Sequence, residues 1–123
     1  MRSYEEFARE REEQNRLVLE SADRVTKRFF SLDALTYRDG ALPAATKELL
    51  GLVASLVLRC DDCVAYHLGR CRDLGHTGEE VSEALGVAMV VGGSITIPHV
   101  RRAVALWGEL TEKASELEER EER

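Results

Sequence analysis

The stretch ELLGLVASLVLRCDDCVAYHLGRC, residues 48–71, joins an apolar helical pattern to three cysteines and a histidine. Its apolar residues recur at three- and four-residue intervals from Leu49 to Val57, and this spacing predicts an amphipathic helix. We expect Pro43 at the first helical position, where proline has no hydrogen bond to lose, and the end of the helix near Arg59. The cysteine pair that follows therefore lies at the start of another helix.

The helix with the cysteines should run from about Asp61 to Leu74 and close at Gly75, because glycine readily adopts the left-handed conformation that ends many helices. The segment TGEE, Thr77–Glu80, is a capping box, with a threonine cap and a glutamate three residues later. It predicts the start of a further helix that runs to about Val91.

Less regular patterns flank this central part. Residues 3–30 carry spaced apolar side chains among many charges, and they predict one long helix or two short ones before a turn at residues 39–40. The glycine pair at 92–93 should break the helix before it, and a last helix begins near Pro98. That helix ends in the tail ASELEEREER, which we expect to be a solvated helical end.

The predicted fold class is all-α, because no strand pattern and no internal repeat are visible. Short connections favour a helical bundle with antiparallel neighbours. A chain of 123 residues predicts a single domain, residues 1–123. Within it we distinguish an N-terminal helical segment (1–40), a core (43–110) and a charged C-terminal tail (111–123).

Composition narrows the range of functions. The formal net charge of −6 argues against a nucleic-acid partner, because phosphate binding needs a basic face. The N-terminus is too charged for a secretory signal, and the longest nearly uncharged stretch, residues 87–100, is too short to span a bilayer. We predict a cytoplasmic protein without a membrane partner, whose cysteines serve catalysis or metal binding rather than structural disulfides. The Arg- and Glu-rich composition also leans towards that of thermophiles.

Helical geometry tests whether the cysteines and the histidine can act together. At about 100° per residue, four side chains share a stripe of roughly 80° on one face: Cys60, Cys63, His67 and Cys71. Cys60 and Cys71 would lie about 16 Å apart along the axis, too far to share one zinc ion with ligand distances of about 2.0–2.3 Å. A zinc site would need the other three residues and a fourth ligand such as Glu48, and the second half of a usual zinc pattern is missing.

A redox dithiol fits the spacing better. A C-x-x-C pair at a helix start places two thiols one turn apart, close enough for a reversible disulfide, and the helix dipole stabilises a thiolate there. Asp61 and Asp62, between the cysteines, oppose a thiolate, although both are good helix caps. His67, one turn after Cys63, is placed to take the thiol proton. Glu48, beside an apolar helix face, is a natural partner for that imidazole.

The remaining cysteine, histidines and tryptophan have simpler interpretations. Cys71 is best explained as a small apolar core residue. His76 is predicted to be a loop residue, and His99, near a helix start, a surface residue. Trp107 fits either the core or a subunit interface.

The four polar residues form the pattern E-x11-C-x-x-C-x3-H, made by Glu48, Cys60, Cys63 and His67. This pattern resembles the active-site motif of the alkyl hydroperoxidase D-like, carboxymuconolactone decarboxylase superfamily. The similarity covers roughly residues 44–108 and includes the segment TGEEVSEAL. It implies a helical bundle of that type in which an antiparallel helix hairpin carries the C-x-x-C motif, and it implies assembly as trimers or hexamers.

The resemblance also implies a role for each motif residue. Cys63 would react with peroxide to form a sulfenic acid, and Cys60 would donate a proton and resolve the sulfenic acid as a disulfide. Glu48 and His67 would relay protons. The lactone decarboxylase branch generally lacks the cysteine pair, which disfavours that activity here. Hydroperoxidase D proteins commonly carry a histidine between the cysteines, where this chain has two aspartates, and the long charged N-terminal helix does not resemble their first half.

We therefore predict a thiol-dependent peroxidase or disulfide reductase that acts on a peroxide or disulfide substrate, with a protein dithiol as electron donor and no cofactor or metal. Its catalytic residues would be Cys63, Cys60, His67 and Glu48. Two other classes stay open. One is a non-enzymatic oligomeric module that senses redox state or binds metal, and the other is a carboxymuconolactone decarboxylase-type lyase.

Overall fold

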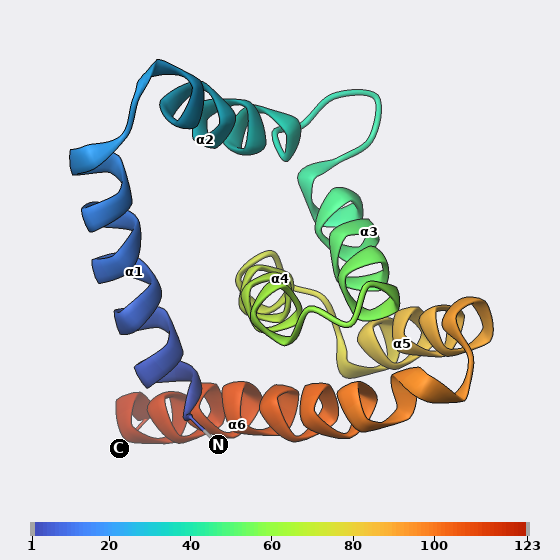
Figure 1. Cartoon of the computed structure of the whole chain (residues 1–123). Coiled ribbons are helices and arrows are strands. Elements are labelled where there is room, and N and C mark those ends of the chain that lie inside the picture. The colour runs from blue at the N-terminus through green and yellow to red at the C-terminus, as the bar shows by residue number, and fades with distance from the viewer. Residues whose placement is uncertain (1, 123) are drawn as a thin grey trace.

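The computed structural model describes residues 2–122, without the side chains of residues 113–118, and every regular element in this part is a helix (Figure 1). The elements are α1 (Tyr4–Ser21), α2 (Arg24–Thr36), α3 (Ala44–Val57), α4 (Asp61–Asp73), α5 (Gly78–Gly92), the short 3-10 helix η1 (Ser94–Thr96) and α6 (Ile97–Glu122). The predicted all-α class is confirmed. No helix in this described part is both long and apolar enough to cross a bilayer.

Helix α4 lies at the centre of the fold, and Figure 1 shows the other helices arranged around it. It packs on α3, with which it forms the predicted hairpin, and on α6, while α5 packs on α3. These four helices share one core of side chains that are nearly or fully buried: Leu52, Leu56, Val64, Leu68, Cys71, Val81, Leu85, Ala88, Ala103 and Leu110.

The turn between α3 and α4 positions Cys60. The Cys60 N–H donates to the Ser55 carbonyl at 3.0 Å, and the Arg59 N–H donates to the Leu56 carbonyl at 2.9 Å. This pair of bonds is the Schellman arrangement, which places a left-handed residue just past the helix end. Arg59 occupies that position with φ 60°, whereas the turn after α4 has Gly75 there with φ 86°. The chain thus holds an arginine in a strained conformation immediately before its first cysteine.

Most of the predicted helix boundaries agree with the structure. The capping box is confirmed, because the Thr77 hydroxyl accepts the Glu80 N–H and the Glu80 carboxylate accepts the Thr77 N–H. Pro43 is a correction: it precedes the first helical residue of α3 instead of being that residue. The Asp39 carboxylate accepts the Ala44 N–H at 2.7 Å and so caps the helix from within the preceding loop.

Outside the central helices, the structure decides between the predicted alternatives and adds one element. The N-terminal segment forms two helices, and α2 continues to Thr36, beyond residue 30. The short helix η1, which the sequence pattern does not show, separates α5 from α6. The backbone of α6 is helical to Glu122, and residues 119–122 are exposed, as expected of a solvated tail. The side chains of residues 113–118, on which the same expectation falls, lie outside the described residues.

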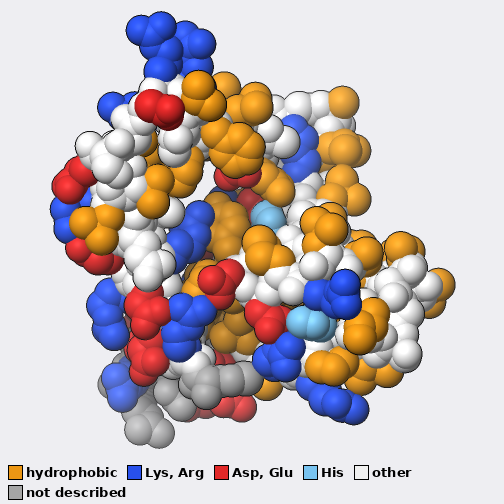
Figure 2. All heavy atoms as spheres, viewed as in Figure 1, with side chains coloured by type: hydrophobic (Ala, Val, Ile, Leu, Met, Phe, Trp, Pro, Cys, Tyr) orange, Lys and Arg blue, Asp and Glu red, His pale blue; other side chains and the backbone are white. Residues whose placement is uncertain are grey.

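Helices α1 and α2, called the arm below (residues 4–36), lie beside this core with little apolar contact. Phe7 is the buried residue of α1, and α2 has none. The start of α1 is anchored: the Tyr4 N–H donates to the Glu109 carboxylate at 3.1 Å, and the Tyr4 phenol occupies the space that a side chain at Gly69 would fill. Figure 2 shows hydrophobic side chains gathered over α2, at the other end of the arm.

Candidate active site

Glu48 and His67 form a buried polar pair inside the core. Glu48 is 2% exposed and His67 7% exposed. The Glu48 Oε2 atom lies 2.7 Å from His67 Nδ1, and the Oε1 atom lies 3.7 Å from the Nε atom of Arg70. A buried carboxylate is costly unless it is paired and hydrogen-bonded, and these contacts supply both conditions. The α3–α4 hairpin therefore makes the contact between acid and imidazole that the sequence predicted.

This contact determines which imidazole nitrogen is free to act as a base. When the imidazole of His67 is neutral, a carboxylate that accepts its Nδ1 hydrogen leaves the lone pair on Nε2. Gly51 of α3 gives the ring its space, because a Cβ at that position would lie 2.6 Å from the Cε1 atom of His67. The imidazole is thus held both by a hydrogen bond and by a close approach to the α3 backbone.

Two tyrosines pack around the same imidazole. The ring centroids of Tyr37 and Tyr66 lie 5.3 Å and 5.2 Å from that of His67. Burial raises the pKa of both phenols, and the Glu48 carboxylate adds to the effect. Both phenols therefore stay protonated at neutral pH. Sequence reasoning missed both residues, and the only local signal was the place of Tyr66 directly before His67.

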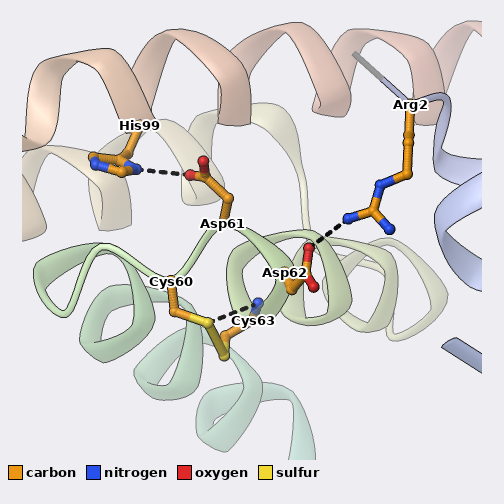
Figure 3. Close-up of a disulfide and its surroundings, with 6 residues drawn as sticks. All are labelled: Arg2, Cys60, Asp61, Asp62, Cys63 and His99. Atoms are coloured by element: carbon orange, nitrogen blue, oxygen red, sulfur yellow. Dashed lines mark hydrogen bonds and ion pairs between the residues drawn. A yellow bond between two sulfur atoms is a disulfide. The ribbon is translucent and has the colours of Figure 1, made fainter. Parts of the chain in front are cut away.

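Cys60 and Cys63 are joined by a disulfide at the start of α4, with their Cα atoms 5.3 Å apart (Figure 3). Cys60 is the residue before the first helical one, and its sulfur accepts the Cys63 N–H at 3.3 Å. The helix N-terminus can therefore stabilise negative charge on the Cys60 sulfur. Cys63 is exposed and Cys60 only half-exposed, so an incoming thiolate would reach the Cys63 sulfur first.

A cavity of about 340 Å³ brings the thiol and the base together, since Cys63 and His67 both line it. Its other walls include Tyr66 of α4 and several side chains of the arm: Phe7, Arg11, Gln14, Asn15 and Asp33. Figure 2 shows the surface hollowed between the arm and the core. The Arg11 guanidinium lies 4.1 Å from the Tyr66 ring centroid and so joins the arm to the aromatic residues around the imidazole. The cavity can take a small polar molecule beside the thiol.

Cys71 is the free cysteine, and it is fully buried in the core. Burial raises the pKa of its thiol to about 12, with a further contribution from the Glu48 carboxylate. A thiol that stays protonated is a poor nucleophile. The burial agrees with the interpretation of Cys71 as a core residue and keeps it apart from the dithiol.

The other two histidines and the tryptophan all contact other helices. His76 is a loop residue, as predicted, but its Nε2 atom lies 2.7 Å from the Ala45 carbonyl and ties that loop to the start of α3. His99 is not the surface residue expected: its side chain is 17% exposed, and its Nδ1 atom lies 2.7 Å from the Asp61 carboxylate. Trp107 packs against the core, which is one of its two predicted places.

Both aspartates between the cysteines are paired with cations from distant parts of the chain. The Asp61 Oδ2 atom lies 2.9 Å from the Nε atom of Arg102, so Asp61 contacts two side chains of α6. Asp62 lies 2.7 Å from the guanidinium of Arg2, next to the disulfide (Figure 3). These partners are 38 to 60 residues away in the sequence, where no spacing rule could have found them.

The residues that were candidates for zinc ligands make other contacts in this structure. The disulfide occupies both thiols, and Glu48 is bonded to His67. Within the described residues, no three side chains of the types His, Cys, Asp and Glu are grouped so that they could hold a metal ion.

Comparison with known proteins identifies the family. Residues 23–106 match the carboxymuconolactone decarboxylase family. Because this match covers more than half of the chain, the protein belongs to that family, as its motif predicted.

Solved structures agree with this assignment. A Thermotoga maritima protein has a TM-score of 0.90 and 55% sequence identity, covering 92% of this chain and 99% of that one. A second structure of it (TM-score 0.87, 54% identity, 90% and 94% covered) is described as a carboxymuconolactone decarboxylase family protein with a suggested part in an antioxidative response. A family protein from Legionella pneumophila has a TM-score of 0.80 and 25% identity, covering 87% of this chain and 96% of that one.

Two curated bacterial proteins are also similar. The uncharacterized protein 4 in the cox locus of Paracoccus denitrificans is 30% identical over 82 residues, which is 67% of this chain and 74% of that protein. An uncharacterized protein of Cupriavidus necator is 33% identical over 73 residues, 59% of this chain and 65% of that protein. Neither name states an activity or a family.

Proposed function

We propose that the protein is a cytoplasmic thiol-dependent peroxidase or disulfide reductase, in which Cys63 reacts, Cys60 resolves, and His67 with Glu48 moves the proton. One observation carries the proposal. Cys63 and His67 line the same cavity, and a buried carboxylate holds the imidazole with its Nε2 atom free. The suggested antioxidative part of the Thermotoga maritima protein supports the same chemistry.

In the oxidative half-reaction, the reduced Cys63 thiol transfers its proton to Nε2 of His67, and the thiolate attacks the terminal oxygen of a hydroperoxide. The O–O bond breaks, the sulfur keeps the hydroxyl group as a sulfenic acid, and the alkoxide takes the proton from the imidazolium and leaves as an alcohol. The sulfur loses two electrons, and the peroxide gains them. Glu48 stabilises the imidazolium, and it also lines a separate cavity of about 690 Å³.

The Cys60 thiol then attacks the sulfenic sulfur, which forms the disulfide, and the hydroxide leaves with the thiol proton as water. An external dithiol resets the site when its thiolate attacks the exposed Cys63 sulfur. Cys60 leaves as a thiolate that accepts the Cys63 N–H. The second donor thiol then displaces Cys63, and the donor ends as a disulfide. A disulfide reductase would use the same exchange in the opposite direction. The reduced dithiol would then attack a substrate disulfide and become oxidised while the substrate is reduced.

We also propose that the protein works as a homo-oligomer, a trimer or hexamer as the family resemblance implies. Support comes from α2, whose apolar side chains lack cover in a single chain: Val25 is 74% exposed, Phe29 67%, Leu32 61% and Leu35 52%. A neighbouring subunit would remove this surface from water. Light scattering should give the mass of three or six chains, and a clean monomer at micromolar concentration would contradict the proposal.

A peroxidase assay with hydrogen peroxide or an alkyl hydroperoxide and several dithiol donors tests the mechanism. Cys63→Ser should abolish turnover, and Cys60→Ser should stop after a single turnover, because no thiol resolves the sulfenic acid. His67→Ala should lower turnover by about 10²- to 10⁴-fold. Glu48→Gln should act in the same direction but less strongly. Glu83→Gln, the same change on an exposed residue of α5, is the matched control and should turn over like the wild type.

The rate at which the reduced protein is alkylated, measured as a function of pH, distinguishes the enzyme from the alternatives. We expect the pKa of the Cys63 thiol to lie below the reference value of about 8.5, and His67→Ala to raise it. Equal titration of wild type and His67→Ala near that reference, with no peroxide consumed, would leave the dithiol as a redox sensor. Lactone decarboxylation that survives Cys63→Ser would favour the lyase.

A further inference from the structure

The two carboxylates between the cysteines pose an electrostatic difficulty for any thiolate at this site. Asp61 adjoins Cys60 in the sequence, and both aspartates lie in the first turn of α4. Carboxylates there stabilise the helix, because they face the positive end of its dipole. The same charges disfavour a thiolate nearby, since like charges raise each other's pKa. A reactive dithiol at this position therefore needs something that offsets the carboxylates.

Asp61 has such an offset on α6. Both of its oxygens are occupied: Oδ1 lies 2.7 Å from His99 Nδ1, and Oδ2 lies 2.9 Å from Arg102 Nε. Figure 3 shows the Asp61–His99 contact directly above the disulfide. The Asp62 side chain is less fully compensated, because its partner Arg2 also binds the Glu10 carboxylate. The strongest neutralisation thus falls on the aspartate that adjoins Cys60.

The contact also fixes the first turn of α4 in place. Asp61 is the first residue of the helix, and Arg102 and His99 lie one turn apart on α6, 41 and 38 residues further along the chain. Both of these side chains are on a helix that packs directly against α4. A rigid base for the turn matters because the Cys60 sulfur and the Cys63 N–H must keep their 3.3 Å contact.

We propose that Arg102, supported by His99, is a positioning residue of the redox centre: it holds Asp61 on α6 and neutralises its carboxylate, so that the first turn of α4 can stabilise a thiolate. The proposal rests on the function proposed above. It assigns a purpose to the departure of this chain from the histidine that hydroperoxidase D proteins commonly carry between the cysteines. Here a paired aspartate keeps its favourable place at the positive end of the helix dipole while its cost to the thiolate is offset.

Charge removal and charge rescue test this proposal. Arg102→Gln leaves Asp61 without its guanidinium, so alkylation of the reduced dithiol at pH 7 should slow by roughly threefold to tenfold, the effect of a pKa rise of about 0.5 to 1 unit. The thiol–disulfide equilibrium with glutathione should shift towards the disulfide by a similar factor, because the reduced form is destabilised. Asp61→Asn should speed alkylation and shift the equilibrium towards the reduced dithiol. The double variant Asp61→Asn with Arg102→Gln should return close to the wild type.

Two controls keep the outcomes distinct. Arg101→Gln removes one charge from the next, exposed position of α6 and should leave both measurements unchanged. Arg102→Lys keeps the charge but loses the planar fork, and it should recover most of the wild-type values. Arg102 is 40% exposed, so these variants should fold.

Equal slowing in Arg102→Gln and in the double variant would overturn the proposal, because a purely structural role is not rescued when the aspartate is removed. Wild-type reactivity in Arg102→Gln would overturn it too. Neither measurement uses peroxide. A protein that shows charge rescue but no peroxide turnover would contradict the peroxidase and leave the positioning role intact.

Discussion

The core and the arm contain similar apolar side chains and place them differently. On α3, Leu52 and Leu56 are fully buried, whereas on α2 Phe29 is 67% exposed and Leu32 61%. Figure 1 shows why: α3 lies against other helices, and α2 lies at the outer end of the arch that the arm makes around α4. Helical periodicity indicates that a face is apolar, but it does not say what covers that face.

The candidate site draws on both regions. The core supplies the groups whose positions must not vary, namely the Glu48–His67 pair and the dithiol. The arm supplies side chains that a substrate would meet, such as Arg11. Burial in the core holds the Glu48–His67 pair. The arm's side of the cavity belongs to a segment that is anchored mainly at its start, through Tyr4 and Phe7.

Matched leucine truncations in the two regions should give the largest difference. Leu56→Ala opens a cavity in the core, and we expect the free energy of unfolding to fall by about 2–5 kcal/mol. Leu32→Ala removes the same atoms from α2, where they lack cover within one chain, and at low protein concentration the cost should stay within about 0.5 kcal/mol. Urea titration at several protein concentrations measures both.

The way in which the cost of Leu32→Ala depends on protein concentration shows whether α2 contacts another subunit or stays exposed to solvent. If a neighbouring subunit covers α2, the cost of Leu32→Ala should grow as the protein concentration rises through the range of assembly, while the cost of Leu56→Ala stays the same. A Leu32→Ala cost near zero at every concentration, with the oligomer intact, would show that this face stays in water.

The buried thiol of Cys71 tests whether water is excluded from the core, and the expected effect is smaller. Its pKa is raised to about 12 in the folded chain, against about 8.5 for a free thiol. A raised folded-state pKa means that the stability is present below the unfolded-state value and is lost as the pH rises through the folded-state value. The free energy of unfolding should therefore fall by up to about 1.4 kcal/mol per pH unit above pH 9.

The variant Cys71→Ala should remove this part of the pH dependence. The window from pH 9 to 10 is the cleanest, because the phenols of Tyr37 and Tyr66, whose pKa values are also raised, affect stability only above their ordinary value of about 10. If the free energy of unfolding depends on pH in the same way for wild type and variant in that window, water reaches the thiol.

The smallest expected effect concerns the turn that positions Cys60 beside the core. Arg59→Gly should relieve the left-handed strain of about 1–2 kcal/mol, offset by the larger chain entropy of glycine in the unfolded state, roughly 0.5–1 kcal/mol. The free energy of unfolding should therefore rise by about 0 to 1.5 kcal/mol. Gly75→Ala, at the matching position after α4, should lose about 1 kcal/mol instead. A loss of stability in Arg59→Gly would reveal a stabilising contact of the arginine side chain.

Local patterns predicted the parts of the molecule that depend on near neighbours. Three helix boundaries depend only on residues within one turn: the capping box at Thr77, the helix start at Asp61 and the stop at Gly75. The local sequence was therefore enough to predict them. The contact between Glu48 and His67 was also predictable, because a short turn leaves two consecutive helices little choice but to pack against each other. The boundary at Pro43 was misplaced by one residue, since a proline can serve either just before or at the first helical position.

The all-α class, the family and the two helices that carry the motif could be predicted from the sequence alone, because helical spacing and four polar offsets are local properties of the chain. Three features needed the folded structure: Asp61 meets Arg102 and His99, Tyr37 and Tyr66 enclose the imidazole, and α2 has no cover in a single chain. Those contacts depend on how each helix is turned about its own axis and at what angle it crosses its neighbours. Such angles follow from the packing of the whole core, and no window of the sequence contains them.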